Sequence, residues 1–189
     1  MVTVAHPQIE PAEYIALQTR AGWQMDIELI DGEAVVMPPT GDRASSVQGE
    51  LFFALRHWQG DFADEGLLLQ DVFVAFPGGP YLAPDVAWWS AGRRPALSGG
   101  AVDAIPDLVV EVLSPATRAN DLGIKRDLYM RSGVRELWLA DPDARTVTRV
   151  QLNGSGDQLF VEGDLLHSEL LDGFALDLAR VFRLLESAG

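Results

Sequence analysis

Apolar residues recur every three or four positions in several parts of the chain, which predicts helices. The clearest case begins near Asp42, a residue suited to the N-cap, and continues with Val47, Leu51, Leu55 and Trp58. Pro11 suits the first turn of an earlier helix, and Gly133 suits the position just after a later one. The sequence therefore predicts helices at residues 7–22, 42–58, 120–132 and 176–185.

Other segments are β-like. The dipeptide Asp31-Gly32 lies between two short β-rich runs and predicts a type I′ hairpin. A second hairpin is expected where residues 67–76 and 81–90 flank a Pro-Gly-Gly-Pro turn. Residues 107–113 are almost entirely apolar, as in a central strand buried on both faces. We expect the strands near 83–89, 107–113 and 135–141 to be adjacent in one sheet. A strand at 145–152 and a further hairpin should follow them.

The combined pattern predicts an α/β protein with a mixed central β-sheet flanked by helices, and with N-terminal and C-terminal β-hairpins. The chain has 189 residues, of which 48% are hydrophobic and 22% charged, an ordinary globular composition. No linker or repeat divides it, so residues 1–189 are expected to form one domain. No apolar run is long enough for a membrane helix and no signal peptide is recognisable, so a cytoplasmic location is expected.

The absence of some residue types excludes several kinds of chemistry. The chain contains no cysteine, which rules out disulfides, thiolate nucleophiles and cysteine-based zinc sites. Its three histidines are far apart and form no metal-binding pair. A Ser-His-Asp hydrolase is ranked last because the GxSxG motif is missing.

Acidic residues outnumber basic ones by 28 to 14, which gives a net charge of −14. This balance opposes binding to nucleic acid, since phosphate contacts normally use a basic surface. The charge is uneven, however, because residues 111–149 hold seven bases and six acids. If the protein binds nucleic acid, Arg118 and Arg126 in this segment are expected to be its main phosphate contacts.

Three residues are the candidates for catalysis. Glu111 lies within the apolar run at 107–113, where an unpaired carboxylate would be costly to bury. Asp85 begins another predicted strand and could supply a second oxygen ligand for Mg²⁺. Lys125 is the only lysine in the chain, which suggests a role that arginine would not fill. Each residue also has a purely structural explanation. Glu111 could be a strand residue that faces water, Asp85 could belong to a turn, and Lys125 could lie on the surface.

The motifs APDVAWWS, EVLSP, D-x-x-x-K-x-x-x-Y and GVRELWLADP occur together in this order. Their combination resembles the Uma-two (Uma2) family of restriction endonuclease-like proteins, over about residues 10–182. That family belongs to the PD-(D/E)XK nuclease superfamily, which implies a restriction endonuclease-like fold. By this resemblance, Asp85 and Glu111 match the two acidic motif residues. The usual motif lysine is replaced by Leu113, and Lys125 in the following helix matches the family's displaced lysine.

The resemblance implies a Mg²⁺- or Mn²⁺-dependent endonuclease, a hydrolase that cleaves phosphodiester bonds of nucleic acid, with DNA as the first choice. Asp85, Glu111 and the backbone carbonyl of Val112 would bind the metal. Lys125 would position the attacking water or stabilise charge on the phosphate. Possible auxiliary residues are Glu50, Asp121 and Tyr129, of which the last two share a predicted helix face with Lys125. Many nucleases of this fold pair up, so a homodimer is expected.

One alternative from a different class remains open. The chain could be a catalytically weak or inactive homo-oligomeric binding or scaffold protein with a nuclease fold. The acidic composition favours this alternative, whereas the intact set of Asp85, Glu111 and Lys125 argues against it. The choice between DNA and RNA stays open at this point.

Overall fold

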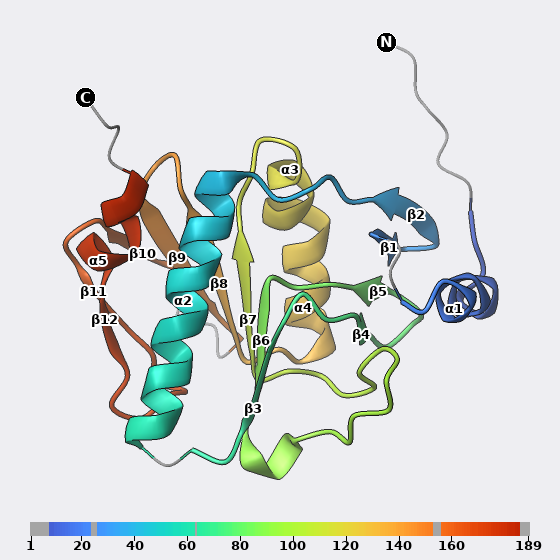
Figure 1. Cartoon of the computed structure of the whole chain (residues 1–189), viewed down its shortest axis with the longest axis horizontal. Helices are drawn as coiled ribbons and strands as arrows, with labels where there is room; N and C mark the ends of the chain where they lie inside the picture. The colour runs from blue at the N-terminus through green and yellow to red at the C-terminus, as the bar shows by residue number, and fades with distance from the viewer. Residues whose placement is uncertain (1–7, 24–25, 63, 153–155, 186–189) are drawn as a thin grey trace.

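The computed structural model describes residues 8–23, 26–62, 64–152 and 156–185. Its central element is a six-stranded sheet in the order β10-β9-β8-β7-β6-β3 (Figure 1). These strands are β3 (Leu67–Gln70), β6 (Val86–Trp89), β7 (Leu108–Val112), β8 (Glu136–Asp141), β9 (Thr146–Gln151) and β10 (Gln158–Val161). Only the β7–β8 pair is parallel, and the other neighbours are antiparallel, so the sheet is mixed.

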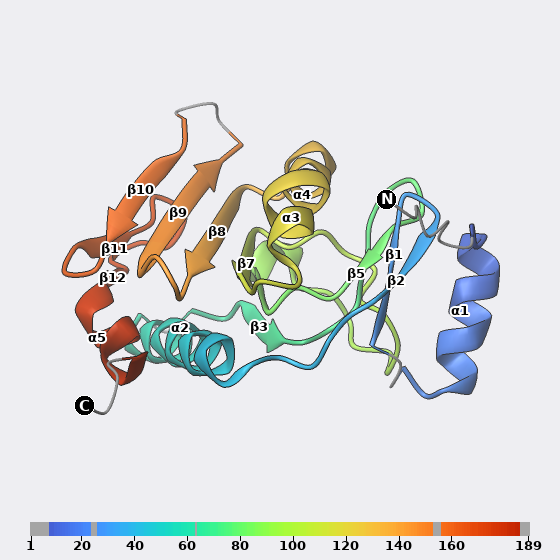
Figure 2. The same ribbon diagram turned by 90° about the horizontal axis from the view of Figure 1, so that it is seen from above.

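Helices cover both faces of this sheet (Figure 2). One face carries α2 (Asp42–Asp61) and α5 (Leu178–Phe182), which is followed by the short turn η3 (Arg183–Leu185). The other face carries α3 (Arg118–Asn120), the π-helical turn η2 (Asp121–Lys125) and α4 (Arg126–Ser132). The helical segment α3–η2–α4 also supplies the crossover that two parallel strands need, because it joins β7 to β8.

A smaller sheet, in the order β2-β1-β5-β4, lies to one side of the central sheet. Helix α1 (Pro11–Arg20) packs beside it, and the Tyr14 hydroxyl donates to the Ile27 carbonyl at 2.7 Å. The remaining elements are β1 (Ile27–Ile30), β2 (Glu33–Val36), β4 (Val74–Ala75), β5 (Tyr81–Leu82), the turn η1 (Ala91–Arg93), β11 (Leu165–His167) and β12 (Ala175–Asp177). No helix among the described residues is both long and apolar enough to cross a bilayer.

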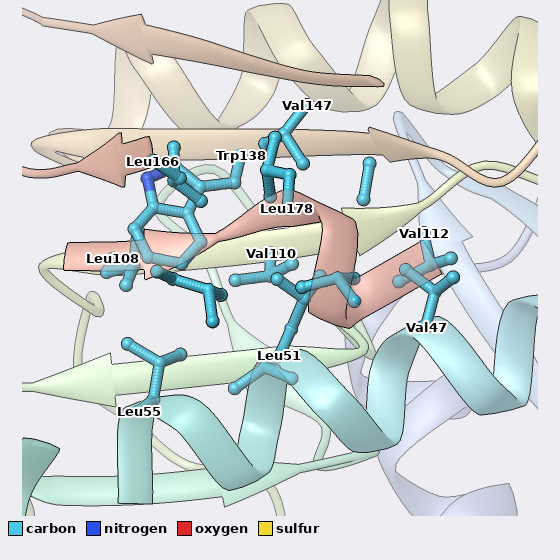
Figure 3. Close-up of a cluster of buried hydrophobic side chains, with 14 of the residues drawn as sticks. Val47, Leu51, Leu55, Leu108, Val110, Val112, Trp138, Val147, Leu166 and Leu178 are labelled. Atoms are coloured by element: carbon cyan, nitrogen blue, oxygen red, sulfur yellow. The ribbon is translucent and has the colours of Figure 1, made fainter. Parts of the chain in front are cut away.

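The hydrophobic core has two parts, one on each face of the central sheet. Alternate residues of β7 point in opposite directions, so Val110 and Val112 join the side chains of α2 and α5. Figure 3 shows this first part, in which Leu51 of α2 lies against β7. Val109 and Leu113 point the other way and join residues of α4 and the small sheet.

Several sequence predictions are confirmed. The strands predicted near 83–89, 107–113 and 135–141 correspond to β6, β7 and β8, which are neighbours in the central sheet. The hairpin at Asp31-Gly32 joins β1 to β2, with φ of +48° and +83° at its two turn residues, as a type I′ turn requires. Gly133 follows α4 with φ of +94°.

Other expectations need correction. Helix α2 starts at Asp42 itself and its N-cap is Gly41, so Asp42 occupies the first helical turn. Leu176 belongs to β12, and the C-terminal helix begins only at Leu178, because Asp177 caps its Ala179 N–H. The predicted second hairpin is divided between two sheets: β3 pairs with β6, whereas β4 pairs with β5. The first helix begins at Pro11, and residue 7 lies outside the described residues.

Candidate active site

Glu111 lies on β7 with its side chain directed toward the helical segment α3–η2–α4, on the same side as Val109 and Leu113. It is only 3% exposed, so it is not a strand residue that faces water. A carboxylate buried to this degree requires a counter-charge or hydrogen bonds. The neighbouring helical segment supplies both.

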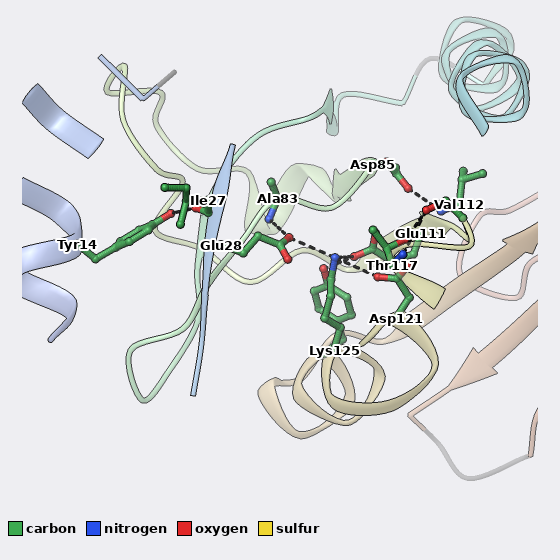
Figure 4. Close-up of polar contacts among 12 residues, drawn as sticks. Tyr14, Ile27, Glu28, Ala83, Asp85, Glu111, Val112, Thr117, Asp121 and Lys125 are labelled. Carbon is green, nitrogen blue, oxygen red and sulfur yellow. Dashed lines mark hydrogen bonds and ion pairs between the residues drawn. The ribbon is translucent and has the colours of Figure 1, made fainter. Parts of the chain in front are cut away.

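Lys125 provides the counter-charge. Its Nζ lies 2.8 Å from Glu111 Oε1, 3.2 Å from Glu28 Oε1 and 3.3 Å from Asp121 Oδ1 (Figure 4). The lysine is 1% exposed, and the Tyr129 hydroxyl donates a hydrogen bond to the same Oε1 of Glu111. The single lysine of the chain is therefore a buried cation shared by three carboxylates, and it is not a surface residue.

The turn that carries Lys125 differs from the regular helix expected from the sequence. Residues Asp121–Lys125 form a π-helical turn with Gly123 at its centre, a residue with low helix propensity. Single π-turns within helices are frequent at functional sites. The π-helical turn is wider than an α-helical turn. It still keeps Asp121 within ion-pair distance of Lys125 and leaves Tyr129 of α4 in contact with Glu111.

Asp85 immediately precedes β6 and approaches Glu111 from the neighbouring strand. Its Oδ2 accepts a hydrogen bond of 2.6 Å from the backbone N–H of Val112, the residue after Glu111. Gln48 of α2 holds the same loop, because its Nε2 donates to the Asp85 carbonyl at 3.0 Å and to Asp71 Oδ1 at 2.7 Å. The structure thus brings together Asp85, Glu111 and Val112, and their predicted role in binding a metal stays a prediction.

These groups open into a pocket of about 300 Å³. Five carboxylates and one lysine are the ionisable side chains among the described residues that line it. Its lining combines these ionisable groups with aromatic and apolar side chains. The lining residues are Trp23, Asp26, Met37, Pro38, Pro39, Thr40, Ala44, Asp71, Phe73, Ala83, Asp85, Glu111, Val112, Ser114, Thr117, Asp121 and Lys125.

Burial and mutual repulsion shift the ionisation of this cluster. Desolvation raises the pKa of Asp85 to about 7, although the Val112 N–H and Lys125 favour its ionised form. Burial also raises the pKa of Glu111 well above its usual range, against the opposing effect of Lys125. For Lys125, burial lowers the pKa, but the carboxylates headed by Glu111 outweigh it and hold the pKa well above its ordinary value. The lysine is therefore protonated at neutral pH.

The donor groups of the pocket fit a hard divalent cation. No three His, Cys, Asp or Glu side chains in the described part of the chain converge as a ready-made metal site. Mg²⁺, however, needs only one or two carboxylates together with carbonyl, water or phosphate oxygens. Asp121 Oδ1 is buried and accepts no hydrogen bond, although it lies 3.3 Å from Lys125 Nζ, and the pocket holds five carboxyl groups against one lysine. A bound dication would relieve this excess.

Four residues singled out from the sequence do not line this pocket, and one of them, Tyr129, still contacts Glu111. Glu50 is on α2, 3.9 Å from Arg180. Arg118 donates to Asp141 at 2.6 Å, and Arg126 donates to both oxygens of Asp157 at 3.0 and 3.1 Å. Phosphate contacts by the two arginines stay a prediction, and such contacts would compete with these carboxylates.

Glu28 is the residue that sequence reasoning missed. It lies on β1, it is completely buried, and its Oε1 accepts from the Ala83 N–H at 2.8 Å as well as from Lys125. The only signal was its position between Ile27 and Leu29 in a hairpin strand, where an alternating polar residue is normally solvated. Glu28 is 97 residues from Lys125 in the sequence, so the contact depends on the tertiary fold.

A comparison with solved structures defines the class of fold. A crystal structure described as "a putative nuclease belonging to DUF820 from Anabaena variabilis ATCC 29413" superimposes with a TM-score of 0.78. The match covers 94% of this chain and 99% of the other, at 19% sequence identity. The fold is therefore the one seen in that nuclease-like protein.

The family follows from the sequence itself. A model of the Uma2 family, described as "Putative restriction endonuclease", matches residues 11–179. The chain belongs to this family, and the resemblance seen in its motifs is confirmed. No curated protein matches the chain.

Proposed function

We propose that this chain is a metal-dependent endonuclease that hydrolyses phosphodiester bonds of nucleic acid, with DNA as its substrate. One observation carries the proposal: the buried Lys125–Glu111 pair lies beside Asp85 in the wall of a single pocket. A protein that needed only a stable fold would gain little from this arrangement, because buried ion pairs contribute little net stability. Perturbed pKa values in a pocket are typical of functional sites.

Asp85, Glu111 and the backbone carbonyl of Val112 would bind Mg²⁺ or Mn²⁺. When bound, the ion would polarise a phosphoryl oxygen and lower the pKa of a water molecule. Asp85 is suited to this role because its pKa of about 7 leaves it sensitive to a nearby cation. Its Oδ2 is already oriented by the Val112 N–H.

Lys125 acts as a fixed positive charge and hydrogen-bond donor. Because its pKa is raised, it is a poor general base and is suited to hold the attacking water or to stabilise charge on the phosphate. Glu28 and Asp121 are positioning residues, since each holds Nζ from a different side. Tyr129 positions Glu111 by donating to its Oε1. We also propose a cytoplasmic homodimer, as expected from the family resemblance, and sedimentation would test the dimer.

The test is a comparison of Lys125→Arg and Lys125→Ala with wild-type protein on plasmid DNA, single-stranded DNA and RNA in Mn²⁺. Both variants should lose cleavage by about a hundredfold or more, because the planar guanidinium displaces the water or phosphate even though the charge is kept. Circular dichroism is the folding control, since the larger side chain must fit a site that is 1% exposed.

Two outcomes would contradict the proposal. Near wild-type cleavage by Lys125→Arg would show that Lys125 is only a charge on a helix. A wild-type protein that cleaves none of these three substrates with Mg²⁺ or Mn²⁺ would favour the inactive binding or scaffold protein instead.

A further inference from the structure

The pocket lining includes aromatic and apolar side chains that phosphodiester cleavage alone does not require. Trp23 and Phe73, which we call the aromatic wall, line the same pocket as Asp85 and Lys125. Their ring centroids are 5.8 Å apart. Both side chains are partly exposed, so an incoming ligand can contact them. Met37, Pro38 and Pro39 add further apolar surface to the lining.

The backbone holds Trp23 in place by an unusual conformation. Its φ is +58°, in the left-handed region that bulky residues rarely adopt, and its N–H donates to the Gln18 carbonyl at 2.8 Å. The indole lies 6.3 Å from Tyr81 and 6.5 Å from Tyr14, measured between ring centroids. Such strain persists only where the surroundings enforce it, and it is common at ligand-binding sites. The ring is thus presented at the pocket in a defined orientation.

The charges near the pocket indicate how a nucleic acid would be held there. None of the described residues that line the pocket is an arginine. Arg118 and Arg126, on the adjacent helical segment, are already paired with Asp141 and Asp157. The chain as a whole carries a charge of −14. Binding by many phosphate contacts, the usual mode for duplex DNA, is therefore weakly supported by this surface.

We infer that the aromatic wall is a stacking site for an unpaired nucleobase, so that the substrate is single-stranded nucleic acid. This inference rests on the proposed nuclease function, since the stacked nucleotide would place its phosphate toward Lys125. Base–aromatic stacking adds to the affinity for single strands whatever the base, because every base has a π-face. In a duplex the bases are already stacked on one another and would not reach Trp23. A volume of about 300 Å³ is at the small end of ligand pockets and suits one nucleotide.

Tryptophan fluorescence provides a direct test in wild-type protein. The other four tryptophans, at positions 58, 88, 89 and 138, are at most 8% exposed, so Trp23 is the one that a ligand can quench. The titration uses oligothymidylate of about ten nucleotides, within the range of single-strand binding sites, and the matching duplex. Ca²⁺ is present to neutralise the carboxylates, and a gel confirms that the strand stays intact.

We expect the single strand to quench the fluorescence and the duplex to leave it unchanged. In Trp23→Leu and Phe73→Leu, the Kd for the single strand, measured by anisotropy of a labelled strand, should rise about tenfold. Phe53→Leu is the matched control, because Phe53 is an exposed aromatic residue of α2 outside this pocket, and it should leave the Kd unchanged. The wild-type titration keeps the test valid even if Trp23→Leu folds poorly.

Cleavage of the same substrates in Mn²⁺ separates this inference from the proposed function. Cleavage of duplex alone, without quenching, would overturn the stacking site and leave the nuclease proposal standing. Quenching without any cleavage would support the stacking site and contradict the nuclease proposal. Equal Kd values for Trp23→Leu, Phe53→Leu and wild type would overturn the stacking site.

Discussion

The two faces of strand β7 differ in their chemistry although they share one backbone. Toward α2, Val110 and Val112 pack in a cluster of apolar side chains. Toward the helical segment α3–η2–α4, Glu111 of the same strand meets Lys125, with Glu28 nearby. The α2 face follows the ordinary rule for a buried sheet, because removing apolar surface from water stabilises the fold. The opposite face buries charges at a free-energy cost.

This difference separates a face that stabilises the fold from a face that carries the candidate active site. Burying an ionised side chain costs several kcal/mol even after relaxation, by general estimates, and an ion pair recovers this only with good geometry. The cluster around Lys125 also leaves Glu28 Oε2 without a hydrogen bond, and Asp121 Oδ1 has only the ion pair with Lys125 at 3.3 Å. Buried oxygens with missing hydrogen bonds do not stabilise a fold, but they suit a site in which a ligand supplies the missing partners.

Removing the positive charge of Lys125 should have the largest effect on stability and on cleavage. Lys125→Met keeps much of the side-chain volume but leaves Glu111, Asp121 and Glu28 without their counter-charge. We expect the free energy of unfolding to fall by about 3–5 kcal/mol, as for other broken buried ion pairs, and cleavage to be lost. Urea denaturation measures the loss. Adding Glu111→Gln to this variant should recover part of it, and a loss below about 1 kcal/mol in Lys125→Met would contradict the coupling.

A cavity on the α2 face should affect stability alone. Leu51 is fully buried in the apolar cluster, so Leu51→Ala should lower the free energy of unfolding by about 3 kcal/mol. Cleavage per folded molecule should stay at the wild-type level, because Leu51 lies on the other side of the sheet from Lys125. Activity at a temperature below the transition, together with a denaturant curve, checks both parts. A large loss of activity in the folded variant would mean that the two faces are coupled.

Mn²⁺ should stabilise the charged face through Asp85 and Glu111. A ligand that binds only the folded state adds about 2.7 kcal/mol to the free energy of unfolding when its concentration is about 100 times its Kd, and this raises Tm. Thermal unfolding with and without Mn²⁺ should show this shift in wild type and a much smaller one in Asp85→Asn. Asp103→Asn is the control, since Asp103 is exposed and lies outside the candidate active site. Equal shifts in all three proteins would place the metal elsewhere.

The ion pair between Arg118 and Asp141 should show the smallest effect, because the Arg118 side chain is half exposed. Burial of Asp141 opposes its ionisation, but hydrogen bonds from the Ala144 N–H, from Arg118 and from the Asp143 N–H outweigh it and hold its pKa below the ordinary value. A lowered carboxyl pKa stabilises the fold above the unfolded-state pKa of about 4, and this stabilisation is lost as the pH falls through the folded-state pKa.

Arg118→Ala should therefore lower the free energy of unfolding at about pH 7 by at most about 1 kcal/mol, because the guanidinium is half exposed. The difference from wild type should shrink as the pH is lowered to about 3, and urea denaturation at several pH values measures it. A difference that grows on acidification would show that Asp141 is not the partner that matters.

Much of the fold was predictable from local patterns. The apolar run at 107–113 is the central strand β7, and Asp31-Gly32 forms the expected hairpin turn. The errors lie at element ends and in strand pairing: Gly41 and not Asp42 caps α2, and the run at 67–76 is divided between two sheets. Strand pairing depends on which distant strand offers hydrogen bonds, and this cannot be predicted from local composition.

The sequence by itself determined which residue types were available for chemistry. It contains one lysine, no cysteine and an acid inside its most apolar strand, and these facts directed attention to Lys125 and Glu111. Only the tertiary structure decided that Glu28 shares this lysine, that Arg118 and Arg126 already have carboxylate partners, and that Trp23 lines the same pocket. The physical reason is that an ion pair or a ring contact acts over a few ångströms in space. Residues 97 positions apart in the sequence, such as Glu28 and Lys125, come within that range only when the sheets and helices pack.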